Sequence, residues 1–264
     1  GVGGVAGMGG VGLILAIAYM LMGGNPLDLL MLVQEQPAAY EQSGGEYREG
    51  AEEREVRQFS AVVLKETENV WNDVFSRSGR RYEEPTLTIY SGSVQSGCGF
   101  ASAGSGPFYC PADQRIYLDL AFSDELRHRF GAPGDFALAY VIAHEVGHHV
   151  QNLLGVLGKV HELRSRVSQE EFNAYSVRLE LQADYMAGVF ARHVQNKNLL
   201  DEGDVEEAMN AASAVGDDTI QKKARGYIMP DSFTHGTSEQ RMRWFRKGFM
   251  AGDLSQGDTF AGQP

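Results

Sequence analysis

Residues 139–155 read AYVIAHEVGHHVQNLLG and contain His144, Glu145 and His148 in the pattern H-E-x-x-H. On a helix, positions i and i+4 lie one above the other on the same face, so two imidazoles at this spacing can reach one metal ion. Zinc suits nitrogen ligands, and a catalytic zinc keeps one position open for water. Glu145 adjoins the first histidine and can act as a general base toward that water. The pattern is therefore typical of a zinc metalloprotease.

The residues around this motif predict a mostly buried helix. The apolar ones are Phe136, Leu138, Tyr140, Val141, Ile142, Val146, Val150, Leu153 and Leu154. Polar groups in a buried helix need partners, so the two histidines and the glutamate indicate a bound ligand rather than a chance pair on a surface helix. His149 directly follows His148 and points about 100° away around the helix, which predicts a packing or surface role for it.

A catalytic zinc needs a third protein ligand, and several suitable side chains follow the motif. They are Glu162, Glu170, Glu171, Glu180, Asp184 and His193. Glu180 and Asp184 share one face of a helix predicted over 170–197, among apolar and small residues. A carboxylate in such a setting is costly unless it is paired or binds a metal. We expect Glu180 to bind the metal and Asp184 to accept a hydrogen bond from an imidazole of the zinc pair.

HEVGHH at 144–149, followed by ELQAD at 180–184, resembles the glutamate-zincins, whose second signature is E-x-x-x-D. The wider chain resembles the neutral zinc metallopeptidase family of bacterial membrane-anchored proteins. That resemblance is carried by the Gly-rich apolar N-terminus and by SGCG, GPFYCP, YLDLAF, HEVGHHVQ, LELQADYMAG and SFTHGTSEQRMRWF. It implies a zinc-dependent peptidase with one zinc ion per chain. By the same resemblance, His144, His148 and Glu180 are the ligands and Glu145 is the base.

His235 and Arg241 lie in SFTHGTSEQRMRWF, residues 232–245. A histidine on a loop just before a helix can face a cleft and donate a hydrogen bond to the oxyanion that develops in peptide hydrolysis. Related membrane-associated zinc peptidases carry a similar His-x-x-x-x-x-Arg segment. We therefore expect His235 to stabilise the oxyanion and Arg241 to anchor the loop by pairing with a carboxylate. The alternative is a surface histidine and an ordinary helix arginine.

Composition and charge restrict the class of protein. The chain has 264 residues and a net charge of -12, and no basic patch stands out, which argues against a nucleic-acid partner. The two cysteines are Cys98 and Cys110. In an oxidising compartment they would form a disulfide around a Gly-rich loop, worth about 3 kcal/mol in the loop-entropy model. Two free thiols in a reduced protein are the alternative.

Residues 1–33 are Gly-rich and apolar and predict one N-terminal membrane anchor. No charge occurs before Asp28, and the apolar run at 11–22 with its flank reaches the roughly 20 residues needed to span a bilayer. A signal peptide is the alternative, although no small-x-small cleavage site follows. We expect a single-pass protein of the bacterial cell membrane whose catalytic domain is extracytoplasmic.

The rest of the chain divides into a polar linker at 34–50, a metallopeptidase domain at 51–252 and a disordered tail at 253–264. Apolar periodicity predicts helices over 51–78, 122–130, 170–197 and 204–223, and strands over 85–90 and 115–120. The expected fold is α+β: a mostly helical, zincin-like metallopeptidase domain with a small antiparallel sheet, preceded by one transmembrane helix. The strand at 115–120 is a candidate edge for binding an extended substrate.

These observations predict a peptidase that cleaves a peptide or protein substrate through a zinc-bound water activated by Glu145. Two alternatives remain at this level. One is a membrane-tethered, non-enzymatic binding or assembly factor with a structural zinc site, and the other is a zinc amidase acting on a non-peptide amide. A structural zinc site usually has four protein ligands, and the sequence offers no fourth ligand at a suitable spacing.

Overall fold

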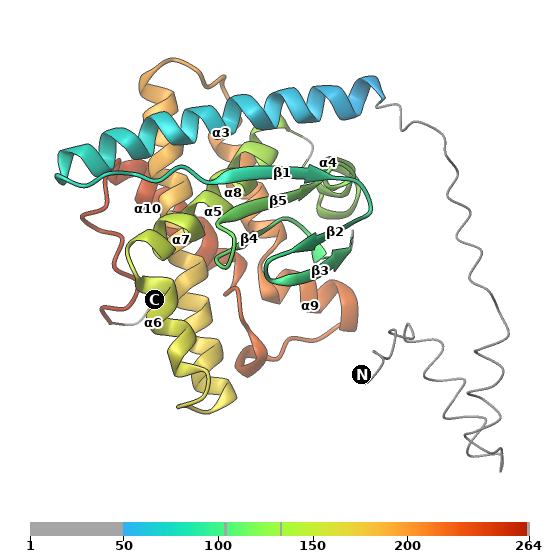
Figure 1. Ribbon diagram of the computed structural model, residues 1–264. Coiled ribbons are helices and arrows are strands. Elements are labelled where there is room, and N and C mark those ends of the chain that lie inside the picture. The colour runs from blue at the N-terminus through green and yellow to red at the C-terminus, as the bar shows by residue number, and fades with distance from the viewer. Residues whose placement is uncertain (1–49, 103–104, 133, 263–264) are drawn as a thin grey trace, which may run out of the picture. The chain divides into compact units, whose positions relative to one another are not determined.

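The computed structural model describes residues 50–102, 105–132 and 134–262 (Figure 1). The predicted anchor at 1–33 and all but the last residue of the predicted linker lie outside these ranges. Within them, no helix combines the length and the apolar character needed to cross a bilayer. The elements follow in the order α3 (Ala51–Arg77), β1 (Thr86–Tyr90), β2 (Ser93–Ser96), β3 (Gly99–Ser102), β4 (Phe108–Cys110), β5 (Arg115–Asp119), α4 (Phe122–Glu125), η2 (Leu126–Phe130), α5 (Asp135–Leu153), α6 (Val156–Leu163), α7 (Gln169–Asn196), α8 (Asp204–Ala214), α9 (Asp217–Arg225), η3 (Pro230–Ser232) and α10 (Ser238–Ala251).

The described chain is mostly helical with a small sheet, as predicted, but the sheet is mixed rather than antiparallel. Its strand order is β1-β5-β4, and β2 and β3 form a separate antiparallel hairpin. β1 and β5 are parallel, with Leu87 opposite Ile116, whereas β4 and β5 are antiparallel. Parallel neighbours require a long connection, and here the hairpin and β4 supply it between β1 and β5. The prediction of an antiparallel sheet was wrong because it considered only the two strands and not the segment that joins them.

The motif helix α5 is the centre of the helical part and contacts α3, α7 and α8. Figure 1 shows α3 lying alongside β1 and across the helices. Two apolar clusters meet at α5: Ile142 belongs to one with α8 and α10, and Val146 to another with Trp71 and Ile116. Burying a side chain of this size stabilises the fold by about 1.5–3 kcal/mol. Because most residues of α5 are buried, its polar residues need partners inside the protein.

Two glycines let α7 and α10 pack closely together. A Cβ atom on Gly188 of α7 would overlap the backbone carbonyl of Phe245, and one on Gly248 of α10 would overlap the carbonyl of Tyr185. Only the absence of side chains permits this approach. The close packing matters for the site, because α7 carries Glu180 and Asp184 and α10 carries Arg241.

The described part of the C-terminal tail is ordered against α7, which corrects the prediction of a disordered segment at 253–264. Gln182 Nε2 donates to the carbonyl of Gly257 at 2.9 Å, and Thr259 Oγ1 donates to the carbonyl of Arg178 at 2.6 Å. Thr259 is only 1% exposed. The tail has few apolar residues, so sequence pattern alone indicated disorder. The backbone groups of the tail bind polar side chains of α7, although the tail forms no helix or strand of its own.

Two predicted helices differ in form from the prediction. The helix expected over 204–223 is two helices, because Val215 leaves the helical conformation and Gly216 is extended with φ -68° and ψ 141°. The helix expected over 122–130 is one turn of α-helix followed by the π-helix η2, which ends at Gly131 in the left-handed conformation. The break at Val215 and Gly216 allows α9 to turn back toward the loop that carries His235.

Candidate metal centre

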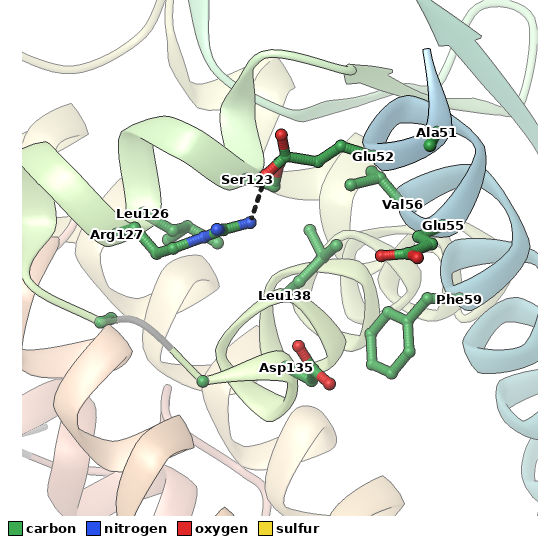
Figure 2. Close-up of a pocket in the computed structure, with 12 residues that line it drawn as sticks. Ala51, Glu52, Glu55, Val56, Phe59, Ser123, Leu126, Arg127, Asp135 and Leu138 are labelled. Carbon is green, nitrogen blue, oxygen red and sulfur yellow. Dashed lines mark hydrogen bonds and ion pairs between the residues drawn. The ribbon is translucent and has the colours of Figure 1, made fainter. Parts of the chain in front are cut away.

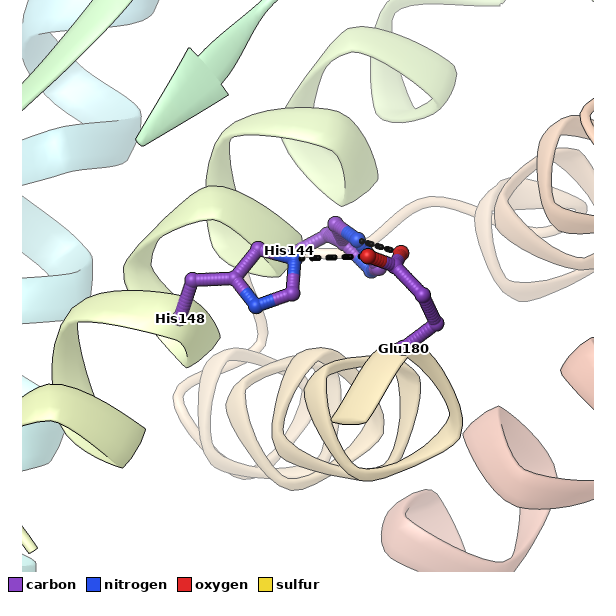
Figure 3. A group of neighbouring side chains, drawn as sticks. All are labelled: His144, His148 and Glu180. Atoms are coloured by element: carbon purple, nitrogen blue, oxygen red, sulfur yellow. Dashed lines mark hydrogen bonds and ion pairs between the residues drawn. The ribbon is translucent and has the colours of Figure 1, made fainter. Parts of the chain in front are cut away.

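Three side chains from two helices converge on one point. His144 and His148 project from α5, and Glu180 projects toward them from α7 (Figure 3). His144 Nε2 lies 3.1 Å from Glu180 Oε2, and His148 Nε2 lies 3.4 Å from Glu180 Oε1. The three ligand atoms lie within 4.8 Å of one another, and they form the one such group of His, Cys, Asp or Glu found in the described ranges. Bonds of about 2.0–2.2 Å from two imidazole nitrogens and one carboxylate oxygen to a single ion fit this spacing.

Gly147 lets the two helices come close enough for this convergence. It lies between the two histidines, and a Cβ atom there would be 3.0 Å from the Cα of Ala183 and 3.1 Å from its carbonyl oxygen. Such contacts are tighter than ordinary packing, so a side chain at this position would push α7 away from α5. The small residue in HEVGH and the alanine in ELQAD therefore place Glu180 opposite the imidazoles.

Asp184 accepts a hydrogen bond from His144 and pairs with Arg241. The sequence analysis expected Asp184 to bind an imidazole and Arg241 to bind a carboxylate. His144 Nδ1 donates to Asp184 Oδ1 at 2.8 Å, and Arg241 donates from Nε to Oδ2 at 2.8 Å and from Nη2 to Oδ1 at 3.0 Å. Tyr140 donates its hydroxyl to the same carboxylate at 2.6 Å. Burial raises the pKa of Asp184, but Arg241 and His144 outweigh burial and lower it to about 2. Asp184 is therefore a carboxylate that fixes the ring of His144 with Nε2 directed at the metal position.

The charges around His144 explain how this ring would behave without a metal. Burial lowers its pKa, but Asp184 and Glu180 outweigh burial and raise the pKa to about 10. The pKa of Glu180 is held well below its ordinary value because His148, His235 and His144 offset its burial. A negative carboxylate beside two imidazoles is a site that takes either protons or a metal cation, and metal binding would release the protons.

Gln151 holds His148, and the sequence analysis did not identify it. His148 Nδ1 donates to Gln151 Oε1 at 2.9 Å, and Gln151 Nε2 donates to the carbonyl of Leu179 at 2.7 Å and to Gln182 Oε1 at 3.1 Å. Gln151 follows His148 by three residues, so both lie on the same face of α5. That spacing was the one available signal, but glutamine is not a residue type that marks a metal site.

Glu145 is the one acidic residue of the motif and lines the same pocket as the three candidate ligands. It is 8% exposed. Burial raises its pKa above the ordinary value, while His148, His144 and the backbone amide of Tyr109 reduce that effect. A carboxylate whose pKa is shifted toward neutrality is a better proton acceptor than an ordinary one.

His235 lies on the loop before α10 and lines this pocket as well. The loop is organised by Asp217, whose Oδ2 accepts backbone N–H bonds from Thr234 at 2.8 Å, His235 at 2.6 Å and Gly236 at 3.0 Å. Glu180 and Asp217 raise the pKa of His235 against the opposing effect of burial. Sequence reasoning missed Asp217, because it placed this residue inside a single helix over 204–223, and only the structure starts a new helix there.

The pocket that holds these residues has a volume of about 430 Å³ and lies between β4, α4, η2, α5 and the His235 loop. A larger hollow of about 680 Å³ lies between the start of α3, η2 and the start of α5 (Figure 2). Its lining includes Glu52 and Arg127, which pair at 3.1 Å, but none of the three candidate ligands. The three candidate ligands therefore line the smaller pocket and not the larger hollow.

Strand β4 forms one wall of this pocket, and this corrects the prediction for the strand at 115–120. That strand is β5, which pairs with β1 along its whole length on one side and with β4 through residues 115–117 on the other. Among the described strands, β4 pairs with β5 alone, and its Phe108 and Tyr109 line the pocket. The sequence could not reveal the strand order, because β4 is only three residues long.

Buried side chains of α5 hold β4 in place. His149 Nε2 donates to the carbonyl of Glu83 at 2.6 Å, and its Nδ1 accepts from the hydroxyl of Tyr109 at 3.0 Å. His149 is therefore a packing residue on the face of α5 away from the ligands, as predicted. The predicted disulfide is also confirmed: Cys98 and Cys110 are bonded, with their Cα atoms 5.8 Å apart. It joins the turn of the β2–β3 hairpin to the last residue of β4.

The fold and the site define a mostly helical α+β protein in which an H-E-x-x-H helix meets an E-x-x-x-D helix around a candidate metal position. The chain belongs to the family described as "Putative neutral zinc metallopeptidase", whose model matches residues 1–260. It is 47% identical over 249 residues to the uncharacterized protein YpfJ of Escherichia coli (strain K12), covering 94% of this chain and 86% of YpfJ. It is 43% identical over 191 residues to the uncharacterized protein Rv2575 of Mycobacterium tuberculosis (strain ATCC 25618 / H37Rv), covering 68% of this chain and 64% of Rv2575. No solved structure matches it.

Proposed function

We propose that this protein is a zinc-dependent peptidase in which Glu145 is the general base. The observation that carries the proposal is the convergence of His144, His148 and Glu180 within 4.8 Å, in a pocket that also contains Glu145. Two imidazoles and one carboxylate form a donor set used by catalytic rather than structural zinc sites, which leaves a fourth position for water. When bound there, zinc would supply a Lewis acid and lower the pKa of water.

Side chains of the protein carry out proton transfer and stabilise the developing negative charge. Glu145, with its pKa raised by burial, takes a proton from the attacking water and passes it to the leaving amine. His235, whose pKa is raised chiefly by Glu180, donates a hydrogen bond to the oxygen of the scissile carbonyl as negative charge develops on it. Asp217 keeps His235 at the rim of the pocket by binding the backbone of its loop.

The open edge of β4 is the element that we expect to bind the substrate backbone. An extended peptide can add to such an edge through main-chain hydrogen bonds, which do not depend on its sequence. β4 lies beside Glu145, since the backbone amide of Tyr109 is one of the groups that lowers the pKa of that residue. A peptide on this edge would therefore have its carbonyl groups close to both Glu145 and the metal position.

The test compares zinc content and proteolysis in matched variants. Purified wild-type protein loaded with zinc should cleave an unfolded protein such as reduced casein, and Glu145→Gln should keep one zinc per chain yet lose at least about 100-fold in kcat/KM, the lower end of what a general base contributes. Glu170→Gln changes an exposed glutamate at the start of α7 and should leave both quantities unchanged. Equal cleavage by the Glu145→Gln protein would remove Glu145 from the mechanism, and zinc-independent cleavage would end the proposal.

We also propose that the catalytic domain is extracytoplasmic and tethered to the membrane by residues 1–33. The disulfide between Cys98 and Cys110 supports the compartment, since such bonds persist in oxidising surroundings. In cells treated with an alkylating reagent, both cysteines should be protected until a reductant is added, and the protein should fractionate with membranes. Immediate alkylation of both thiols would place the domain in a reducing compartment instead.

A further inference from the structure

The pocket beside the candidate metal centre has a set of apolar lining residues, which we call its apolar end. Its apolar lining comes from four elements and the turn after α8: Phe108, Phe122, Phe130, Val141 and Val215. Val141 precedes His144 by three residues and Glu145 by four, so it lies one helical turn along the same face of α5. Phe122 and Phe130 lie beside each other, with ring centroids 6.4 Å apart. This apolar end therefore adjoins the position where a peptide bond would be cleaved.

Apart from Glu145, the charged side chains that line the pocket already contact other charged groups. Arg241 binds Asp184 through two nitrogens, and Glu180 contacts both His144 and His148. Among the described lining residues, His235 is a charged group outside this cluster, and its Nδ1 already pairs with Asp217 Oδ1 at 3.4 Å. A charged substrate side chain entering the apolar end would lose its hydration without gaining a partner, which is costly. An apolar side chain would instead gain from leaving water.

We propose that this apolar end is a specificity subsite for one bulky apolar side chain, such as leucine, methionine or phenylalanine, next to the scissile bond. The inference rests on the proposed peptidase function and adds the substrate class: extended, unfolded polypeptide segments that expose large apolar residues. The volume of about 430 Å³ is at the low end of ligand pockets and suits one peptide unit with its side chain.

The first experiment measures cleavage of a series of ten-residue peptides, blocked at both ends, that differ at one central position. The zinc-loaded wild-type protein should cleave the leucine and phenylalanine peptides with a kcat/KM about 10- to 100-fold above the glycine and aspartate peptides, as expected for burial of one large side chain. Mass spectrometry of the products locates the preferred residue relative to the cleaved bond. Equal rates across the series, or a preference for charged or small residues, would overturn the inference.

A second experiment assigns the preference to this part of the pocket. Val215→Phe would narrow the apolar end, and it should reduce the ratio of kcat/KM for phenylalanine over alanine peptides about tenfold while zinc content stays at one per chain. Val62→Phe makes the same change at a 62% exposed position on α3 and should leave that ratio unchanged. If the Val215→Phe protein folds and binds zinc but keeps the wild-type ratio, the subsite lies elsewhere. If it does not fold, the wild-type peptide series alone decides.

Binding measurements separate this inference from the proposed function. Fluorescence anisotropy with labelled peptides on the zinc-loaded Glu145→Gln protein should give a Kd about tenfold lower for the leucine peptide than for the glycine peptide. Such a preference together with no cleavage by wild type would overturn the peptidase but support the subsite. Cleavage by wild type with equal rates and equal affinities for the leucine and glycine peptides would support the peptidase and overturn the subsite.

Discussion

Each metal-facing imidazole is fixed by a hydrogen bond on the nitrogen that faces away from the metal position. His144 is held by Asp184, and His148 is held by Gln151. Both bonds select the tautomer that leaves Nε2 free for a cation. The spacing of Glu180 and Asp184 in the sequence predicted that both carboxylates lie on one helix face, directed at the two histidines. It could not reveal Gln151 or Asp217, because an amide and an aspartate within a predicted helix carry no metal signature until the fold brings them to the site.

Replacing Gln151 should weaken zinc binding without unfolding the protein. In Gln151→Met the side chain keeps its length, but His148 Nδ1 loses its acceptor and the ring is free to rotate. We expect zinc affinity to fall about 10- to 100-fold, the usual effect of losing such a partner. Competition with a chromophoric chelator measures it, and Gln195→Met, at an exposed position on the same helix as Glu180, is the control. Unchanged affinity would show that Gln151 only packs.

Asp217 should make the stability of the protein depend on pH at the acidic end. Burial raises its pKa, but His235 and the loop amides outweigh burial and lower it below 3.8. A depressed pKa means that the stabilisation is complete above the unfolded-state pKa and disappears as pH falls through the folded-state pKa. In metal-free protein, Asp217→Asn should reduce the free energy of unfolding by about 1–2 kcal/mol at pH 7. The difference should shrink steadily below about pH 4, near the unfolded-state pKa.

Urea denaturation at a series of pH values measures this difference. Asp201→Asn, at an exposed position before α8, should show no such pH dependence. A wild-type advantage that persists undiminished at the lowest pH would mean that the Asp217 carboxylate contributes by packing rather than by its charge.

At the scale of elements, the site depends on how closely α5, α7 and α10 approach one another. Apolar periodicity predicted the bounds of α3 and α7 closely, because each buries a continuous stripe, but it did not predict α6. It could not predict that β1 and β5 are parallel, that α8 and α9 are separate, or that the tail packs on α7. Those features depend on connections and on polar contacts with Gln182 and Arg178, which leave no periodic pattern.

The crossing of α7 and α10 gives a direct test of this dependence. Gly248→Ala places a methyl group against the carbonyl of Tyr185, so the helices must separate and Arg241 must shift relative to Asp184. We expect a loss of about 1–3 kcal/mol in the free energy of unfolding, as for other overpacked interiors. Gly158→Ala, in α6 with nothing within 4 Å of the added atom, should be neutral or stabilising by up to about 1 kcal/mol. Equal effects of the two substitutions would show that α7 and α10 adapt freely.

At the scale of the whole molecule, the metal position joins parts of the chain that are far apart in sequence. α5 and α7 supply the candidate ligands, α10 supplies Arg241, and the tail reaches the same network through Gln182 and Gln151. Unfolding any of these parts removes a ligand or its support, so an unfolded chain has no preformed site. A metal bound at this candidate site would therefore stabilise the folded protein as a unit.

Zinc should accordingly raise the thermal stability of the wild-type protein. It should not raise the thermal stability of a variant that lacks one of the three candidate ligands. At a free zinc concentration about 100 times the Kd, the stabilisation is about 2.7 kcal/mol. For a domain of this size that corresponds to a Tm increase of roughly 5–10 °C over the EDTA-treated protein. Differential scanning fluorimetry should show this increase in wild type and in His128→Ala, which changes an exposed histidine of η2. His144→Ala should lose it; a full zinc shift in that variant would mean that the ion binds elsewhere in the chain.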